Sequence, residues 1–249
     1  MTERKRARPD DYFKNWKERE ALAEGMIPLV GRMSREKNVK CYIYGRTLVN
    51  RSVLQIMKDH RYVRQVEGNE LSEFETYPVF TYISGLDLGP AHIDVGRLAV
   101  RFQEEGAAAG LSLEQFLDRE LAQLVGNKIK PLAEPQDVVL YGFGRIGRLM
   151  ARILIEKTNG GDGLRLRAVV VRKGKAPNDL VKRVSLLRRD SVHGAFDGTI
   201  RVDEERQSFI ANGNEVKVIY ADSPADIDYT AYGINKAIIV DNTGVWRDE

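Results

Sequence analysis

The sequence contains little cysteine and little histidine, and its net charge is small. The low cysteine content and the small charge each argue against a class of protein. The 249 residues include one cysteine, Cys41, and three histidines. A disulfide framework and a multi-cysteine metal site within the chain are therefore excluded, and the low cysteine content is typical of a reducing cytoplasm. Lys and Arg total 39 against 36 Asp and Glu, and a net charge of +3 is too small to indicate nucleic-acid binding by itself.

Long apolar runs are missing as well. No stretch approaches the roughly 20 residues that a membrane-spanning helix needs, so no membrane segment is expected. Met1–Asp10 is basic and lacks the apolar core of a signal peptide, and we expect a disordered tail there. With 43% hydrophobic and 30% charged residues, the composition is that of a globular chain with a buried core.

Apolar residues at helical spacing dominate the first half of the chain. Stripes of this kind run over Leu22–Met33, Val53–Met57, Val95–Phe102 and Leu113–Val125. Capping signals accompany them, in chain order Asn50 or Ser52, Ser72 with Glu75, and Ser112 with Gln115. Residues 1–135 are therefore predicted to form an all-α helical domain.

The pattern changes at Lys130–Pro135, whose two prolines favour an extended connector. Strand patterns then follow at Val138–Tyr141, Ala168–Val171, Thr199–Val202, Gln207–Ala211, Glu215–Tyr220 and Lys236–Val240. Helices are predicted over Arg145–Glu156 and Asp179–Arg188, and Asn212-Gly213 is a strong hairpin signal. Residues 136–249 are predicted to form an α/β, Rossmann-type NAD(P)-binding domain, of which the first half and an antiparallel hairpin excursion are present.

A glycine-rich turn lies between the first of these strands and the first helix. Its residues fit the pattern G-x-G-x-x-G: Gly142, Phe143, Gly144, Arg145, Ile146 and Gly147. In such turns the first glycine permits a tight bend, the second admits a pyrophosphate to the backbone, and the third lets helix and strand pack closely. The pyrophosphate is expected on the helix N-terminus near Arg145 and Ile146. The alternative is a turn of the same shape with no ligand.

Cationic residues follow the second predicted strand. At this position an NAD-binding domain usually has an acidic residue that binds the ribose 2′-hydroxyl. Arg172-Lys173-Gly174-Lys175 stands there instead. Cations favour a 2′-phosphate, so we expect a preference for NADP or tolerance of both cofactors. The alternative is a solvated loop, with Asp179 or a backbone group binding the ribose.

Motifs in this half resemble those of glyceraldehyde-3-phosphate dehydrogenase. Four match in order, namely Val139–Leu149, Asp190–Ile200, Asn212-Gly213-Asn214 and Asn242–Trp246. The resemblance implies a Rossmann fold, an NAD(P) cofactor, and oxidation of glyceraldehyde 3-phosphate to an acyl phosphate through a cysteine thioester. It also implies that Thr243 and Gly244 lie beside the nicotinamide ribose, and that the complete enzyme is a homo-oligomer. Residues 1–135 look like the N-terminal extension of a longer bacterial subgroup.

The sequence departs from the family in its cofactor-binding positions. The family's acidic ribose-binding residue falls on Lys173 and the asparagine before it on Arg172, which favours NADP. The arginine that the family places near the adenine is not evident at Ala221-Asp222-Ser223-Pro224.

The family's nucleophilic cysteine motif is also missing, and we expect it beyond Glu249. Cys41 lies in the helical half with no histidine nearby in sequence and is interpreted as a core residue. His193 belongs to the Asp-Ser-x-His-Gly turn and is interpreted as structural, and His60 and His92 are assigned no role. The chain is therefore predicted to bind cofactor without turnover, and no catalytic or metal-binding residue is assigned.

A different class of function stays open beside this one. The helical half could be a regulatory module that binds a partner protein or nucleic acid through its basic stretches, Arg4-Lys5-Arg6, Arg32 with Arg35 and Lys37, and Arg61 with Arg64. Such charges more often form solvated faces, so nucleic acid is the less favoured partner.

Overall fold

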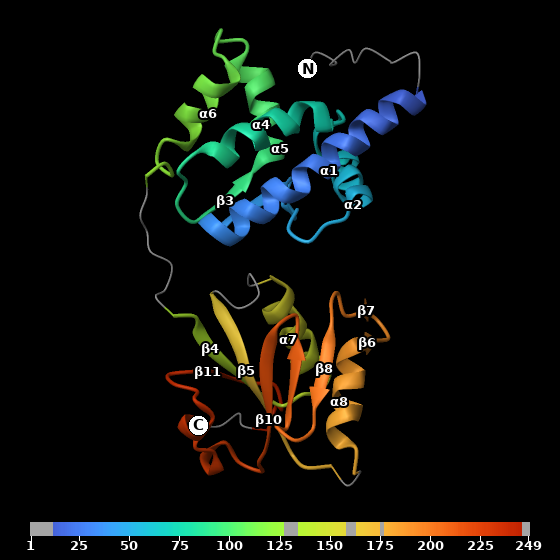
Figure 1. The fold of residues 1–249 in the computed structure, drawn as a ribbon, viewed down its shortest axis with the longest axis vertical. Coiled ribbons are helices and arrows are strands. Elements are labelled where there is room, and N and C mark those ends of the chain that lie inside the picture. The colour runs from blue at the N-terminus through green and yellow to red at the C-terminus, as the bar shows by residue number, and fades with distance from the viewer. Residues whose placement is uncertain (1–11, 127–133, 158–162, 175–176, 246–249) are drawn as a thin grey trace. The chain divides into compact units, whose positions relative to one another are not determined.

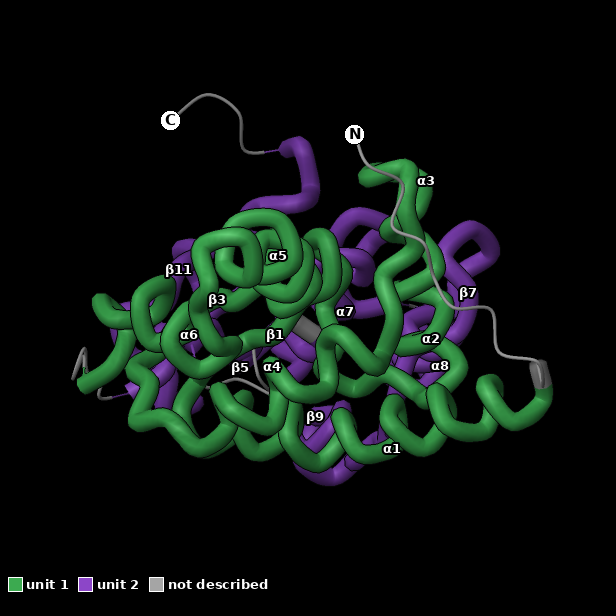
Figure 2. Tube along the Cα trace, turned by 90° about the horizontal axis from the view of Figure 1, so that it is seen from above, with its two compact units in different colours: residues 1–131 green, residues 132–249 purple. Residues whose placement is uncertain are grey.

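A computed structural model describes residues 12–126, 134–157, 163–174 and 177–245 of the chain. The fold divides into two compact units, unit 1 (residues 1–131) and unit 2 (residues 132–249), shown in separate colours in Figure 2. The expected tail Met1–Asp10 and the Lys130–Ala133 part of the expected connector lie outside the described residues. Within the described ranges, no helix is both long and apolar enough to cross a membrane.

Unit 1 is built mainly of helices. In chain order they are α1 (Tyr12–Lys37), α2 (Val53–Tyr62), α3 (Arg64–Glu67), α4 (Glu73–Gly85), α5 (Val95–Arg101), the π-helical turn η1 (Phe102–Gly106) and α6 (Leu113–Leu121). Capping boxes begin three of these helices, with Ser52, Ser72 and Ser112 as the caps. Ser52 rather than Asn50 therefore begins α2, and the two other predicted boxes are confirmed.

The prediction that residues 1–135 are all helical is wrong in one respect, because unit 1 also contains a three-stranded sheet of order β2-β1-β3. Its strands are β1 (Val39–Ile43), β2 (Arg46–Thr47) and β3 (Ala91–Asp94), and β1 pairs in parallel with β3. These strands are only two to five residues long, and an alternation of three inward residues, as in β1, is too brief to predict a strand by itself. The partner of β1 also lies far along the chain, where local periodicity carries no signal.

The core of unit 1 gathers side chains from α1, α4 and the small sheet. Val39, Cys41 and Ile43 alternate inward along β1 and are fully buried. The interpretation of Cys41 as a core residue is thereby confirmed. Burial also raises the pKa of the Cys41 thiol to about 12, so the thiolate that a nucleophile requires is strongly disfavoured.

Polar groups are buried between α1, α2 and α4 as well. Arg19 donates two hydrogen bonds to the carboxylate of Glu73, whose side chain has no exposed surface. His60 is fully buried beside it: Nδ1 donates to the Ile56 carbonyl (2.8 Å), and Nε2 accepts from the hydroxyl of Thr76 (2.7 Å). Burial lowers the pKa of His60 and so favours its neutral form, while the two hydrogen bonds select one tautomer, which gives it a structural role.

Unit 2 is an α/β domain whose sheet has six strands in the order β11-β4-β5-β10-β9-β8 (Figure 1). The strands are β4 (Gln136–Tyr141), β5 (Leu164–Val171), β8 (Ile200–Asp203), β9 (Ser208–Ala211), β10 (Asn214–Tyr220) and β11 (Ile238–Asp241). Strands β11, β4, β5 and β10 run parallel, whereas β8 and β9 pair antiparallel beside them. The predicted Rossmann-type fold with a hairpin excursion is confirmed, and the hairpin turns at Asn212 and Gly213, both with positive φ.

The two faces of this sheet are covered differently. Helices α7 (Arg145–Lys157) and α8 (Asp179–Arg188) contribute to the larger apolar cluster, on one face. The other face packs beneath the segment between β10 and β11, which contains the short helices η3 (Pro224–Asp226) and η4 (Tyr229–Tyr232). This arrangement leaves the carboxyl ends of the parallel strands as the edge where a ligand can approach.

A small hairpin follows α8, formed by β6 (Arg189–Asp190) and β7 (Gly194–Ala195). Arg152 from α7 is buried and donates to the carbonyls of Leu187 and Gly194, which ties the hairpin to the helices. Asp190 accepts from the backbone N–H groups of His193 and Val192, and these bonds hold the Asp190 pKa well below its usual range. The His193 ring contacts the same carboxylate, as a structural role predicts.

Candidate functional site

A crevice opens where the parallel strands of unit 2 end. Strand order reverses at β4, because β5 and β10 lie on one side of it and β11 on the other. Ligands of open α/β sheets bind at such a switch point. A cavity of about 260 Å³ lies there, lined by Tyr141, Gly142, Phe143, Val170, Val171, Arg172, Arg183, Ala221, Thr243 and Val245. Four of the ten site residues expected from the sequence (Gly142, Phe143, Arg172 and Thr243) are thus brought together directly.

Two glycines of the turn are required by the protein itself. Gly142 has φ +97°, a conformation that other residues rarely adopt, and a Cβ there would lie 2.9 Å from Thr243 Cγ2. At Gly147 a larger residue is excluded by packing, because an added Cβ would lie 2.3 Å from the Gly142 carbonyl oxygen. The close helix–strand packing expected of the third glycine is therefore present.

Gly144 is different, because nothing in the described structure requires a glycine there. Its φ is not in the left-handed region, and a Cβ would meet no atom within 4 Å. Open space remains in front of its backbone, as the approach of a pyrophosphate requires. The following residues, Arg145 and Ile146, begin α7 and are exposed. Their backbone N–H groups belong to the first helical turn, which has no intrahelical acceptors and attracts anions.

Phe143 anchors the turn to the sheet. Its ring is buried and stacks on Phe209 of β9, with 6.1 Å between the ring centroids. Hydrogen bonds hold the loop after β11 in place. Asn242 N–H donates to the Tyr141 carbonyl (2.7 Å), and Asp241 accepts from the backbone and hydroxyl of Thr243. Gly244 follows with a positive φ, whereas Trp246 lies outside the described residues.

Cations border the crevice at the end of β5. Arg172 and Lys173 are exposed there, whereas Lys175 lies outside the described residues. Arg183 from α8 is a further lining residue, which was not predicted from the sequence. It donates from Nη2 to the Arg172 carbonyl (2.9 Å) and from Nε to Asp179 Oδ2 (2.7 Å). The available signal was its spacing from Asp179, which places the two side chains on one helix face.

Asp179 is engaged within this group of residues. Desolvation raises the pKa of the Asp179 carboxyl, but hydrogen bonds from Arg183, the Gly174 N–H and the Tyr220 hydroxyl outweigh it and lower the pKa. A Cβ on Gly174 would lie 2.4 Å from Asp179 Oδ1, so glycine is needed for this approach. The carboxylate is therefore ionised and already supplied with donors, which disfavours it as the ribose ligand.

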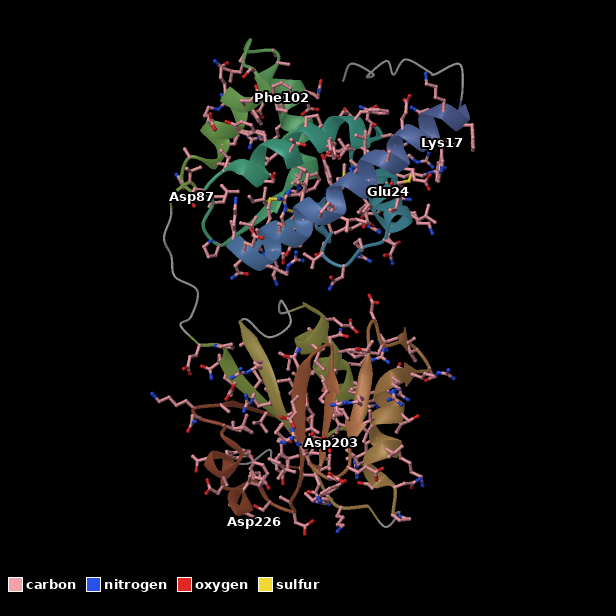
Figure 3. The ribbon with its side chains drawn as sticks, in the orientation of Figure 1. Lys17, Glu24, Asp87, Phe102, Asp203 and Asp226 are labelled. Atoms are coloured by element: carbon pink, nitrogen blue, oxygen red, sulfur yellow. The ribbon has the colours of Figure 1, made fainter. Side chains whose placement is uncertain are left out.

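Tyr141 is a second lining residue that was not assigned from the sequence. Its side chain is buried at the end of β4, and desolvation raises the pKa of its hydroxyl, with Arg172 opposing the shift. Asp226, labelled in Figure 3, is one of three aspartates that raise it further. The hydroxyl stays protonated near neutral pH and is available to donate. Ala221, which belongs to the stretch that lacks the family's adenine-binding arginine, lines the same cavity with a small side chain.

In the described part of the chain, no three His, Cys, Asp or Glu side chains lie together in a group that could hold a metal ion. Among the basic stretches considered for nucleic acid, Arg64 pairs with Glu70 at 3.6 Å. The features that do converge are a glycine turn, a helix N-terminus and a cationic border at the switch point. They define a protein that carries a Rossmann-type dinucleotide-binding domain.

Comparison with known families identifies the domain more closely. Residues 136–249 match the family model for the NAD binding domain of glyceraldehyde 3-phosphate dehydrogenase. Unit 2 therefore carries an NAD-binding domain of the glyceraldehyde-3-phosphate dehydrogenase type.

Individual relatives differ in how much of the chain they match. A glyceraldehyde-3-phosphate dehydrogenase-like protein of Pseudomonas aeruginosa is 59% identical over 225 residues, which are 90% of this chain and 48% of that protein. The glyceraldehyde-3-phosphate dehydrogenase of Thermotoga maritima is 33% identical over 114 residues, 45% of this chain and 30% of the enzyme. The first similarity therefore extends into unit 1. The chain spans about half the length of the Pseudomonas protein, and its match to the Thermotoga enzyme spans less than a third of that enzyme.

The burial of Cys41 leads to a simple expectation. In the native chain a thiol reagent at pH 8 should modify Cys41 at least about a hundredfold more slowly than in the chain unfolded by guanidinium, because both access and thiolate formation are suppressed. Reaction is followed by absorbance of the released chromophore. Equal rates in the two states would show that Cys41 is not held in the core.

Proposed function

We propose that unit 2 binds NAD(P) in the crevice between the ends of β4, β5 and β11. The main support for this proposal is the glycine at position 144. Neither backbone strain nor packing requires a glycine there, and the space in front of its backbone is open. The pyrophosphate is bound by the first-turn N–H groups of Arg145 and Ile146, next to Gly144 and with Gly147 closing the helix onto the strand. Thr243 and Gly244 lie at the nicotinamide ribose, and Phe143 keeps the turn in place.

In the complete protein this unit serves a phosphorylating oxidation of glyceraldehyde 3-phosphate, a cytoplasmic, glycolytic reaction carried out by a homo-oligomer. The cofactor supplies the hydride acceptor, and the described residues bind and orient it. The single cysteine of this chain is buried in unit 1. The 249-residue chain therefore binds cofactor but does not oxidise the aldehyde.

NADP is the preferred cofactor in this proposal. Arg172 and Lys173 are exposed at the end of β5, where an acidic side chain would repel a 2′-phosphate. Asp179, the carboxylate considered as an alternative ribose ligand, is already engaged with Arg183. A 2′-phosphate at this border gains charge-assisted hydrogen bonds that a 2′-hydroxyl cannot match.

Calorimetric titration of the chain with NADP and with NAD tests both parts of the proposal. We expect NADP to bind at least about tenfold more tightly, the equivalent of one charge-assisted hydrogen bond. The double variant Arg172→Asn with Lys173→Asp should remove this preference. Arg201→Asn is the matched control, because Arg201 is an exposed cation on β8 at the far edge of the sheet.

Two outcomes contradict the proposal, and they contradict different parts of it. Tighter binding of NAD than of NADP would overturn the cofactor preference and leave the site standing. Absence of binding by both would overturn the crevice as a cofactor site in this chain. Salt-sensitive binding of nucleic acid that cofactor does not affect would favour the alternative of a regulatory binding module.

A further inference from the structure

Two arginines line the crevice, and the structure holds them in different ways. Arg172 is exposed at the end of β5, and its backbone carbonyl accepts a hydrogen bond from Arg183. Arg183 comes from α8, and its side chain is only 24% exposed. Two hydrogen bonds fix its guanidinium, one to the Arg172 carbonyl and one to Asp179. A side chain fixed at two points loses little further freedom when it binds a ligand.

The guanidinium of Arg183 retains donors after these two bonds are made. It has five N–H groups in a planar fork, and the bonds to Arg172 and Asp179 use two of them. The same side chain lines the cavity. The planar fork matches the oxygen atoms of a phosphate, to which arginine often donates two parallel hydrogen bonds.

Asp179 is what fixes Arg183 in this position. Its side chain is 17% exposed, and three donors surround it: Arg183 Nε, the Gly174 N–H and the Tyr220 hydroxyl. The closeness of Gly174, where no Cβ would fit, ties the loop that carries Arg172 and Lys173 to the same carboxylate. Arg172, Lys173 and Arg183 thus lie together at this border, and the Asp179 carboxylate beside them is already paired.

We propose that Arg183 is a specificity-determining residue for a cofactor that carries a 2′-phosphate, and that Asp179 is a positioning residue that acts through Arg183. This inference rests on the proposed function, because it assigns one further contact within the same crevice. Arg183 donates to the 2′-phosphate from the α8 side, while Arg172 and Lys173 reach it from the β5 side. Asp179 makes no contact with the ribose hydroxyl.

Titration with two halves of the cofactor isolates this contact. Adenosine 2′,5′-bisphosphate carries the additional phosphate and 5′-AMP lacks it, so the ratio of their dissociation constants reports the 2′-phosphate alone. Arg183→Met should weaken the bisphosphate about tenfold or more and change 5′-AMP by less than about twofold. Lys182→Met is the matched control, because Lys182 is the exposed neighbour on α8, and it should change neither ligand.

A double-mutant cycle separates positioning from direct contact. Asp179→Asn keeps an acceptor for the Gly174 N–H but removes the charge that holds Arg183, and it should weaken the bisphosphate by about three- to tenfold. In the Arg183→Met background the same substitution should have no further effect on that ligand. A fall in 5′-AMP and NAD affinity on Asp179→Asn would instead make Asp179 the ribose ligand and overturn the inference.

The remaining outcomes distinguish this inference from the function on which it rests. If the wild-type chain binds the bisphosphate more tightly than 5′-AMP while Arg183→Met behaves like Lys182→Met, the inference fails and the cofactor site stands. If the wild-type chain binds no adenosine ligand, the proposed function fails and the inference fails with it. Hydrogen exchange of unit 2 peptides in each variant verifies that the fold is intact before binding is compared.

Discussion

Replacing Gly147 with alanine should destabilise unit 2 and abolish cofactor binding together. The new Cβ would lie 2.3 Å from the Gly142 carbonyl oxygen, a backbone atom that no side-chain rotation can move away. Helix α7 must then shift away from β4, and overpacking of this kind costs about 1–3 kcal/mol. The shift also displaces the first-turn N–H groups, so binding should fall below detection. Denaturant unfolding of unit 2, followed by hydrogen exchange of its peptides, measures the first effect and calorimetry the second.

Gly144→Ala is the matched comparison, because it adds the same methyl group three residues earlier where no atom lies within 4 Å. Stability should change by less than about 0.5 kcal/mol, as for other exposed positions. Dinucleotide affinity should still fall by about tenfold or more, because the methyl group occupies the approach to the backbone. A Gly144→Ala chain that binds as tightly as the wild type would remove the main support for the proposed site. A Gly147→Ala chain of unchanged stability would show that α7 shifts at little cost.

The fold of unit 2 was predictable because its signals are local. A buried strand, three glycines at set spacing and an amphipathic helix follow one another from β4 to α7, and each is legible in a window of a few residues. Asn212-Gly213 likewise specifies its hairpin through two residues that tolerate positive φ. The predicted bounds of α8 agree with those observed, Asp179–Arg188.

What escaped prediction depends on residues far apart in sequence. The pairing of β1 with β3 joins short segments on either side of α2, α3 and α4, and neither segment alone has a distinctive pattern. Arg183 enters the crevice only because α8 packs where its side chain reaches the loop after β5. Asp179 could be proposed as a site residue from its position in the sequence. Its role could not be predicted, since its partners come from that loop, from α8 and from β10. Spacing along the chain reveals which residues share an element, and packing decides which elements share a site.

Arg19→Met should lower the stability of unit 1 by about 3 kcal/mol at neutral pH. The substitution leaves the carboxylate of Glu73 without its bidentate partner, in a position with no exposed surface. Removal of one member of a buried ion pair costs more than the pair contributes, because the remaining charge stays desolvated. Lys17→Met is the control: Lys17, labelled in Figure 3, is an exposed residue of α1 whose ammonium lies over the Phe13 ring. Its loss should cost less than about 1 kcal/mol. Hydrogen exchange of unit 1 peptides measures both.

The pH dependence of this effect follows from His60, which lies 3.8 Å from Glu73. Burial lowers the pKa of His60 from 6.5, Glu73 opposes the shift, and Arg19 adds to it. Below pH 6.5 the unfolded chain therefore binds a proton that the folded chain does not, and the stability of wild-type unit 1 falls as the pH falls. Without Arg19, the proton is better tolerated in the folded state because it partners Glu73. The stability difference between wild type and Arg19→Met should therefore narrow from pH 8 to pH 5. A constant difference over that range would mean that His60 and Arg19 do not interact across the Glu73 carboxylate.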